Sequence, residues 1–574
     1  MKKLCLNLAM GALAVTLSLA TSLSAQVSPQ FLAAGSSAMF NSFAYAAANP
    51  TSGICGGHHW SKKNGASIDD TARNSNIPLE AGNIWIAWDN STNPTTVCAY
   101  VSVDSSVGVR AFMANPVAVV DLASSYVGTF GDSLVGTLSS EAATDALPLA
   151  IQQSINKQSV LQAMTDVRPE DAKFATERAL ATLNARLPYT SGVYYGLGYN
   201  QGAATGVGTP IYSSQSATKA TPVEFNLFGN DPFTGGATPA WHTDNVGAAP
   251  VVVFANVTDN ASGSGGLGDP TLAITNVDRY TLAGLLSGRI SRTRDLSTAS
   301  GASSVGVNVF IREPLSGTMN TMEYNVTNSV GVYANVPQAP WGPALYSGQE
   351  TNVGNPSCPC PTFGTSNAAN PLQLPTAAGM RYRVVGTGEM VKTVAKTADA
   401  LGYAFWGYGN FSASNNNAPT TTHYLTVDGT DPLFANGTNP NGVGVFPTPT
   451  SGVYPSLTFP NIQNGSYPVW TMYRVVYTNA TRSFTKQIIA AAQANANRMM
   501  SDFIPASSVN VFHTHFYQEQ FGGMNGNLGT LNGGCPVTTG DCESGGDAGG
   551  QVFNNQAALD NYTDTGYELV GMRK

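Results

Sequence analysis

Apolar and polar residues alternate along much of the chain in the two rhythms typical of strands and helices. Residues 80–91 and 95–106 alternate at every second position, which predicts two strands joined by a turn. Residues 249–257 and 307–311 are continuous apolar runs, which are typical of strands covered on both faces. Residues 276–296 predict a short amphipathic helix followed by a basic turn.

Helical patterns lie between and beyond these strands. Residues 31–47 predict a short strand, a small-residue turn and a helix, and residues 386–410 predict a helix, a turn and a strand. In residues 160–188 an apolar stretch runs into a polar turn, after which we expect a helix that begins at Pro169. A further helix is predicted over residues 483–504. Strands that alternate with helices indicate the α/β class, in which ligands bind outside the carboxyl ends of the strands.

Composition describes the surface more than the fold. Charged residues make up only 11% of the 574 residues, and 60 glycines together with many Asn, Thr and Ser fill their place. Residues 189–247 therefore read as long loops, and residues 521–550 as a surface appendage. The net charge of -8 and the lack of a basic patch exclude nucleic acid or an anionic membrane as the main partner.

Residues 1–25 have the pattern of a secretory signal peptide. Lys2 and Lys3 are followed by an apolar core over residues 4–19 and then by small residues that offer cleavage sites. No later stretch has the unbroken apolar length of a membrane span. We therefore expect an exported protein, soluble and monomeric, in the periplasm or outside the cell. An uncleaved membrane anchor is the alternative.

Six of the seven cysteines remain after removal of the signal peptide, and an even number in an exported chain suggests disulfides. We expect two pairs, Cys55 with Cys98 and Cys535 with Cys542. The two remaining cysteines are Cys358 and Cys360, in the sequence CPCP, and they then pair with each other or stay reduced.

The histidines do not indicate a metal site. His58 and His59 form one pair and His513 and His515 form another, but neither has the spacing of a zinc module around the cysteines. We expect no bound metal and no cofactor.

One arginine precedes a Ser-Gly-Thr where a predicted strand turns into a predicted helix. Arg312 is followed four residues later by Ser316, Gly317 and Thr318, and residues 319–325 can be helical. A helix start presents unpaired N–H groups, glycine allows close approach, and a guanidinium suits a tetrahedral oxyanion. These four residues predict an anion cradle. The alternative is an ordinary helix cap beside a surface ion pair.

Several segments, taken in order, resemble the type 2 periplasmic substrate-binding proteins, and among them the phosphate-binding subunits of ABC importers. The most specific contains the Arg-x-x-x-Ser-Gly-Thr loop just described. The resemblance is discontinuous and covers most of residues 30–515, through these segments: AAGSSAMFNSF (33–43), AYVSVDSSVGVRAF (99–112), TDVRPEDA (165–172), APVVVFANV (249–257), VFIREPLSGTMNTMEY (309–324), GTGEMVKTVAKTADALGYAFW (386–406) and SYPVWTMYRVVY (466–477).

The resemblance implies two α/β lobes joined by a hinge that the chain crosses twice, with the ligand clamped between them. Lobe one would contain residues 26–225 and 400–520, and lobe two would contain residues 226–399. The last stretch, residues 521–574, would be the Gly/Asn-rich appendage.

The resemblance also implies a set of ligand contacts. The backbone N–H of the first helix start and a serine hydroxyl would donate to the anion from lobe one, and the arginine loop would close the site from lobe two. A buried aspartate would accept the proton that phosphate keeps and would repel sulfate, which keeps none. Asp171 is the better match for this aspartate and Asp166 is the second choice. The other implied contacts are Phe40, Ser105, Arg312, Ser316, Gly317 and Thr318.

The sequence departs from this pattern in several places. Met39 stands where the family commonly has a hydroxyl residue, Asn41 where proline is usual, and Pro314 where importer members often carry an acidic residue. The chain also has long insertions that are not typical of importer subunits, near residues 113–160, 189–247 and 411–450.

These observations favour a binding protein for phosphate or a related oxyanion, possessing no catalytic residues and with an ABC permease as the implied partner. One alternative is a surface or structural protein built on a binding-protein scaffold that has lost its ligand. Another is a secreted phosphatase, although Ser105 has no histidine near it in the sequence to activate it. For Trp85 and Trp88, core packing is expected rather than sugar stacking.

Overall fold

The computed structural model describes part of the chain. The predicted signal peptide, the helix expected after Pro169, Asp171 and three cysteines (Cys358, Cys360 and Cys535) lie outside the described residues. Of Cys542 only the backbone is described. The described residues are 27–49, 53–69, 80–114, 116–122, 147–167, 199–200, 209–210, 241–257, 265–287, 292–297, 299, 303–312, 316–322, 325–326, 372–373, 380–384, 386–411, 422–447, 457–496, 502–509, 542–543 and 552–553.

The first half of the fold is one side of a large mixed sheet. Its centre is parallel, with the first strand lying between the two others, and antiparallel strands extend it to the edge. From the centre outward these strands are β6 (Gln162–Thr165), β1 (Phe31–Ser36), β4 (Val97–Val103), β3 (Glu80–Trp88), β2 (His58–Asp69) and β5 (Val119–Leu122).

Helices cover both faces of this half. One face packs against α2 (Phe40–Ala48) and α14 (Arg482–Ala496), and the other packs against α3 (Ser105–Met113) and α4 (Leu149–Ile155). A disulfide between Cys55 and Cys98 ties the chain after α2 to β4, as the sequence predicts.

The second half has the same construction. Strand β11 (Asn308–Arg312) lies parallel to both β13 (Met380–Val384) and β14 (Ala400–Phe405), and β12 (Leu372–Gln373) closes the edge. Its helices are α6 (Arg279–Ser287), α7 (Gly317–Met322), α9 (Thr387–Lys396) and α10 (Tyr408–Phe411).

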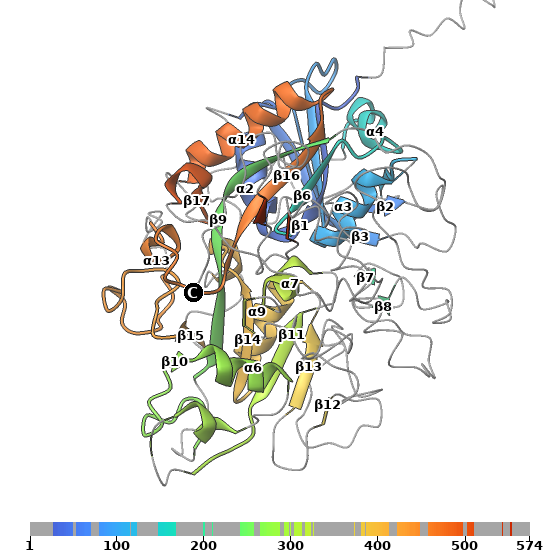
Figure 1. Ribbon diagram of the computed structural model, residues 1–574. Helices are drawn as coiled ribbons and strands as arrows, with labels where there is room; N and C mark the ends of the chain where they lie inside the picture. Colours follow the sequence, from blue (N-terminus) through green and yellow to red (C-terminus); the bar gives the residue numbers. More distant parts are fainter. Residues whose placement is uncertain are drawn as a thin grey trace, which may run out of the picture.

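Two long strands join the halves. Strand β9 (Trp241–Asn256) pairs through its first ten residues with β16 (Trp470–Thr478) and through its last residues with β14 and β15 (Thr422–Val427). Figure 1 shows β9 running from the upper half, beside β16 and β6, to the lower half, beside β14. The two halves therefore belong to one continuous sheet, and the helix α7 lies between them.

The remaining short elements border this framework. They are η1 (Ser37–Met39), β7 (Tyr199–Asn200), β8 (Thr209–Pro210), β10 (Asn276–Val277), η4 (Thr293–Leu296), α13 (Pro460–Gln463), β17 (Ile504–Pro505), η6 (Ala506–Ser508), β18 (Cys542–Glu543) and β19 (Val552–Phe553).

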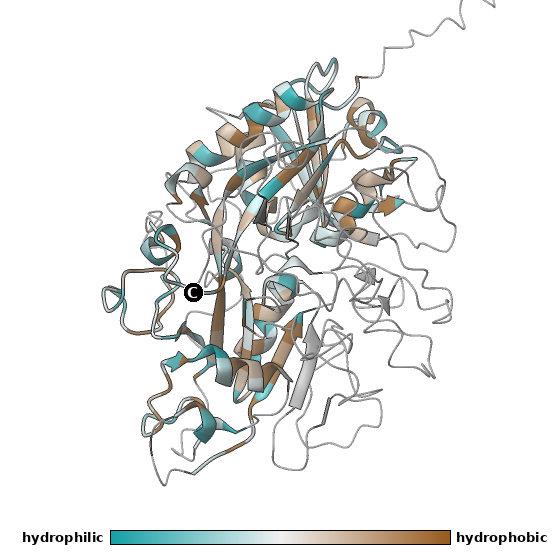
Figure 2. Cartoon of the chain, viewed as in Figure 1, coloured by the Kyte–Doolittle hydropathy of each residue, from teal (hydrophilic) through white to brown (hydrophobic). Residues whose placement is uncertain are grey.

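The apolar residues predicted as strands form the core. Figure 2 shows apolar residues along the strands and polar residues on the outer surface of α14. One apolar cluster runs from α2 along β9 into the second half, and a second cluster fills the space between the first half of the sheet and α3. Trp85 and Trp88 are both 1% exposed and lie in these two clusters, so the prediction of core packing is confirmed.

The predicted α/β class, with two strand-and-helix halves, is confirmed. The prediction of a loop up to residue 247 was wrong at its end, because β9 begins at Trp241 and pairs with β16 from there. Strand β14 pairs with β11 and with β9. The predicted lobe boundaries stay a prediction. Among the described residues, no helix is both long and apolar enough to cross a membrane.

Candidate functional site

The carboxyl ends of the parallel strands in the two halves lead to the same buried place. In the first half, β1 ends at Ser36, β4 is followed by Ser105, and β6 is followed by Asp166. In the second half, β11 ends at Arg312, and α9 begins with Thr387 just after β13. Parallel strands present their carboxyl ends at one edge of a sheet, which is where α/β proteins bind ligands.

Asp166 is the centre of the first half of this site. Its carboxyl group accepts a hydrogen bond from the Ser105 hydroxyl and another from Ser36, and its side chain is buried. Its backbone carbonyl accepts a hydrogen bond of 2.9 Å from the Thr471 hydroxyl. The position of Ser105 depends on close packing of α3 against β1, because a side chain on Gly108 would overlap the carbonyl of Ala34.

Arg312 is the centre of the second half of the site. One of its terminal nitrogens donates to the Thr387 hydroxyl at 2.9 Å and to the Thr318 hydroxyl at 3.2 Å. Its backbone N–H donates to the Tyr403 hydroxyl at 3.1 Å. Because β11, α7, α9 and β14 all contribute to these contacts, the guanidinium is held in one orientation while only 2% exposed. Ser316, which is also buried, caps the next turn by accepting a hydrogen bond of 3.4 Å from the Met319 N–H.

The two halves touch at Gly317. A methyl group on this glycine would overlap the carboxyl group of Asp166, so the start of α7 lies directly against the aspartate of the opposite half. Arg312 also acts electrostatically on Asp166. The structure thus brings Arg312, Gly317 and Thr318 close to Ser105 and Asp166.

Burial raises the pKa of Asp166 to about 7. Four interactions oppose this rise: a hydrogen bond with its own backbone, the positive charges of Arg312 and Arg474, and the hydrogen bond from Ser36. The carboxyl group therefore exchanges its proton near neutral pH, in a place where two positive charges favour an anion.

Two residues of β16 belong to this neighbourhood and were missed by the sequence reasoning. Arg474 is 3% exposed, and its positive charge lowers the pKa of Asp166. The Tyr473 hydroxyl is fully buried, has no hydrogen-bond partner among the described residues, and its pKa is raised well above the ordinary value by burial and by Asp166. The only signal in the sequence was a charged residue inside the apolar run of residues 466–477.

Two predicted residues have a different outcome. The backbone N–H of Phe40 donates to the carbonyl of Ser37, so the structure does not leave this donor free for an anion. Its ring packs on Trp85 and Tyr100. Asp171 lies outside the described residues, and Asp166, the second choice of the sequence, occupies the site.

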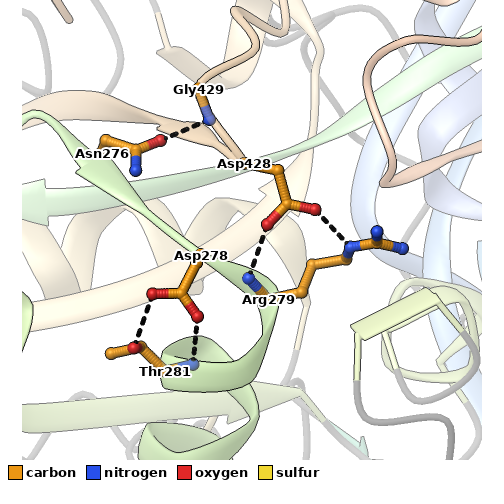
Figure 3. A network of polar contacts seen from close by, with 6 residues as sticks. All are labelled: Asn276, Asp278, Arg279, Thr281, Asp428 and Gly429. Carbon is orange, nitrogen blue, oxygen red and sulfur yellow. Dashed lines mark hydrogen bonds and ion pairs between the residues drawn. The ribbon is translucent and has the colours of Figure 1, made fainter.

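A second polar network closes the outer end of α6 and is not a ligand site. Asp278 accepts hydrogen bonds from the N–H and hydroxyl of Thr281 at the start of the helix. Arg279 pairs with Asp428, and the Gly429 N–H donates to Asn276 (Figure 3). These groups satisfy one another and tie the turn after β15 to α6.

Metal chemistry has no support in the described part of the chain. No group of three or more histidine, cysteine, aspartate or glutamate side chains there is placed to hold an ion. His58 stacks on Trp88, with 5.9 Å between the ring centroids, which is a packing contact.

Similarity searches give distant structural matches. No protein-family model matches the sequence, and no curated protein matches it. A phosphate-binding protein from Stenotrophomonas maltophilia is 14% identical, over 62% of this chain and 80% of its own length, with a TM-score of 0.28. An ABC-type phosphate transport receptor from Vibrio cholerae is 14% identical, over 46% of this chain and 71% of its own, with a TM-score of 0.23. Values this low carry no argument about the ligand.

Proposed function

We propose that this protein is an exported solute-binding protein that captures phosphate between its two halves. The observation that supports this most is the meeting of Arg312 and Thr318 from one half with Ser105 and Asp166 from the other, all of them buried. A guanidinium and several hydroxyl donors around a carboxyl group suit an oxyanion that carries both negative charge and a proton.

Each side chain has a distinct task in this proposal. Arg312 neutralises charge and donates from its planar group, whose orientation Thr387 and Thr318 fix. Thr318 would donate from one side of the site. Ser105, whose hydroxyl donates to Asp166 in this structure, would turn to donate from the other side, and Ser316 offers a further hydroxyl. Gly317 keeps the start of α7 open to close approach.

The carboxyl group of Asp166 would provide the discrimination. When it is ionised, it accepts a hydrogen bond from the proton that phosphate retains, whereas it repels sulfate. Because the pKa of this group is about 7, the discrimination should be strongest above neutral pH and should weaken as the carboxyl group becomes protonated.

We place this protein in the periplasm or outside the cell on the pattern of residues 1–25. An ABC permease is a proposed partner, and binding rather than turnover is the proposed activity. No described residue offers a nucleophile paired with a histidine base in the site.

Titration calorimetry with phosphate, on protein stripped of carried anion by partial unfolding and dialysis, tests the proposal. We expect saturable binding of phosphate, and no binding of sulfate above neutral pH. Arg312→Ala should lower the affinity by on the order of a hundredfold or more, because a buried charge-assisted contact is lost.

A matched control separates the site from the fold. Arg294→Ala removes an exposed arginine of the same half and should leave both affinity and stability unchanged. Unchanged affinity in Arg312→Ala would remove this residue from the site. No heat with either anion in the wild type would favour a scaffold that has lost its ligand.

A further inference from the structure

Arg474 lies on the joining strand β16, directly beside β6, the strand that Asp166 follows. In the antiparallel pairing of β16 with β6, Arg474 stands opposite Thr165, the residue before Asp166. The side chain is 3% exposed, and one terminal nitrogen donates to the carbonyl of Met472 at 2.9 Å. A buried positive charge on the joining strands therefore acts on the aspartate, in addition to that of Arg312 from the second half.

The strand pairing is irregular at this point. Tyr473 pairs with Gly247 and Arg474 pairs with Asn245, so Val246 of β9 is left over in a bulge. Bulges bend the sheet locally and are frequent beside functional sites, where they redirect side chains. A charged residue so deeply buried is rare unless it has a charged partner, and Asp166 is the carboxylate on which Arg474 acts.

We propose that Arg474 is a second guanidinium of the anion site and acts through Asp166. The two positive charges of Arg312 and Arg474 are then neutralised by two negative charges, which the Asp166 carboxyl group and bound phosphate share. This inference rests on the proposed function. It makes Arg474 a positioning residue that determines which ionised form of phosphate the protein takes up.

Charge counting gives the consequence. Two guanidiniums are neutralised either by a carboxylate with monoanionic phosphate or by a carboxylic acid with dianionic phosphate, and both arrangements contain two acidic protons. With one guanidinium, the neutral complex is a carboxylic acid with monoanionic phosphate and contains three. Because excess charge is costly in a buried site, losing Arg474 should move the best binding to lower pH.

The two tyrosines near Asp166 do not change this count near neutral pH. Tyr100 of β4 and Tyr473 of β16 both have a pKa raised well above the ordinary value, chiefly by burial, and stay neutral. Asp502 is a further buried acid, which acts on Tyr473; it is present in the wild type and in both variants, so it does not alter the comparison among them. Ser36 and Ser105 do not titrate.

Calorimetry with inorganic phosphate, on wild type, Arg474→Gln and Arg474→Lys between about pH 5.5 and about pH 8.5, tests the inference. We expect wild-type affinity to peak near neutral pH. The Gln variant should peak about one pH unit lower or more, and should bind about tenfold more weakly at the alkaline end. The Lys variant keeps the charge and should keep the wild-type pH profile, at reduced affinity.

Two further readouts keep the test decisive. Repeating the wild-type titration in buffers of different ionisation heat measures protons exchanged on binding, and needs no variant. We expect proton uptake above neutral pH and proton release below it. Carboxyl NMR of the anion-free proteins measures Asp166 directly, and its pKa should rise in the Gln variant but not in the Lys variant.

The outcomes separate the two proposals. A wild type that binds no phosphate at any pH refutes the proposed function, and with it the sharing of charge with phosphate. Phosphate binding in which the Gln and Lys variants show the same pH profile, or in which the wild type takes up protons at every pH, overturns the role of Arg474 alone.

Discussion

At the scale of single residues, Asp166 is the group whose ionisation couples this fold to pH. Burial raises its pKa to about 7 in the folded protein, from 3.8 where the group is in water. Between these values the folded protein holds a proton that the unfolded chain has lost. The contribution of this proton to the stability of the folded protein is therefore complete below about pH 4 and is lost as the pH rises through 7.

We predict that the anion-free wild type loses unfolding free energy between about pH 4.5 and about pH 7.5, by up to about 4 kcal/mol from this group. Asp166→Asn should lack this loss, because the amide does not titrate. Urea unfolding of both proteins at the two pH values measures the difference. Parallel pH dependences would show that the carboxyl group titrates normally.

Gly317 gives a steric prediction at the same scale. In Gly317→Ala the new methyl group overlaps the Asp166 carboxyl group, so the two halves cannot approach as closely. We expect phosphate affinity to fall by tenfold or more, at a destabilisation of about 1–3 kcal/mol. Gly57→Ala is the matched control, since a methyl group there meets nothing within 4 Å. Calorimetry and urea unfolding give both quantities, and equal affinities in the two variants would contradict the contact.

Local motifs could be predicted from the sequence, and long-range neighbours could not. Arg312, Gly317 and Thr318 lie within one strand-to-helix turn, so their spacing, together with the resemblance of the ordered segments, predicted an anion site. Arg474 enters through the pairing of β16 with β6, whose partners are about three hundred residues apart in the chain. Its only local signal is a charge inside an apolar run, which does not indicate the partner strand. The donor predicted at Phe40 failed because a tight turn uses the N–H within itself.

At the scale of elements, apolar patterns identified most strands because the strands are buried. The start of β9 was missed because it contains His242, Thr243, Asp244 and Asn245, which read as loop residues. Asp244 finds its partner only in the folded sheet, where it accepts a hydrogen bond of 2.6 Å from the Tyr477 hydroxyl on β16. Periodicity reports burial of apolar side chains, and it does not register polar residues that pair across strands.

The disulfide between Cys55 and Cys98 gives a prediction at this scale. It closes a loop with a sequence separation of 43 and fixes the connection after α2 to β4. Restriction of the unfolded chain by a loop of this length contributes about 4 kcal/mol in the chain-entropy view. We expect the Cys55→Ala, Cys98→Ala double variant to lose about 2–4 kcal/mol of unfolding free energy, measured in urea. Reductant should destabilise the wild type more than the double variant, and a wild type insensitive to reductant would contradict this.

At the scale of the whole molecule, the candidate site joins two halves that each have their own parallel strands and helices. β9 and β16 connect them, and the core runs continuously along β9. Because Asp166 and Ser105 belong to one half and Arg312 and Thr318 to the other, an anion that binds all four stabilises both halves together. A ligand held by one half alone would stabilise that half more than the other.

Hydrogen exchange distinguishes these cases. We expect phosphate at about one hundred times its dissociation constant to slow exchange in β4 and in β11 by about the same factor, approaching a hundredfold where exchange requires global unfolding. The reason is that the complex must dissociate before either half opens. Mass spectrometry of peptides that cover residues 97–103 and 308–312 measures the two rates. Arg312→Ala should show no slowing in either peptide, while Arg294→Ala should behave as the wild type. Protection confined to one peptide would place the anion on one half, and the bridging role of the Asp166–Gly317 contact would then be wrong.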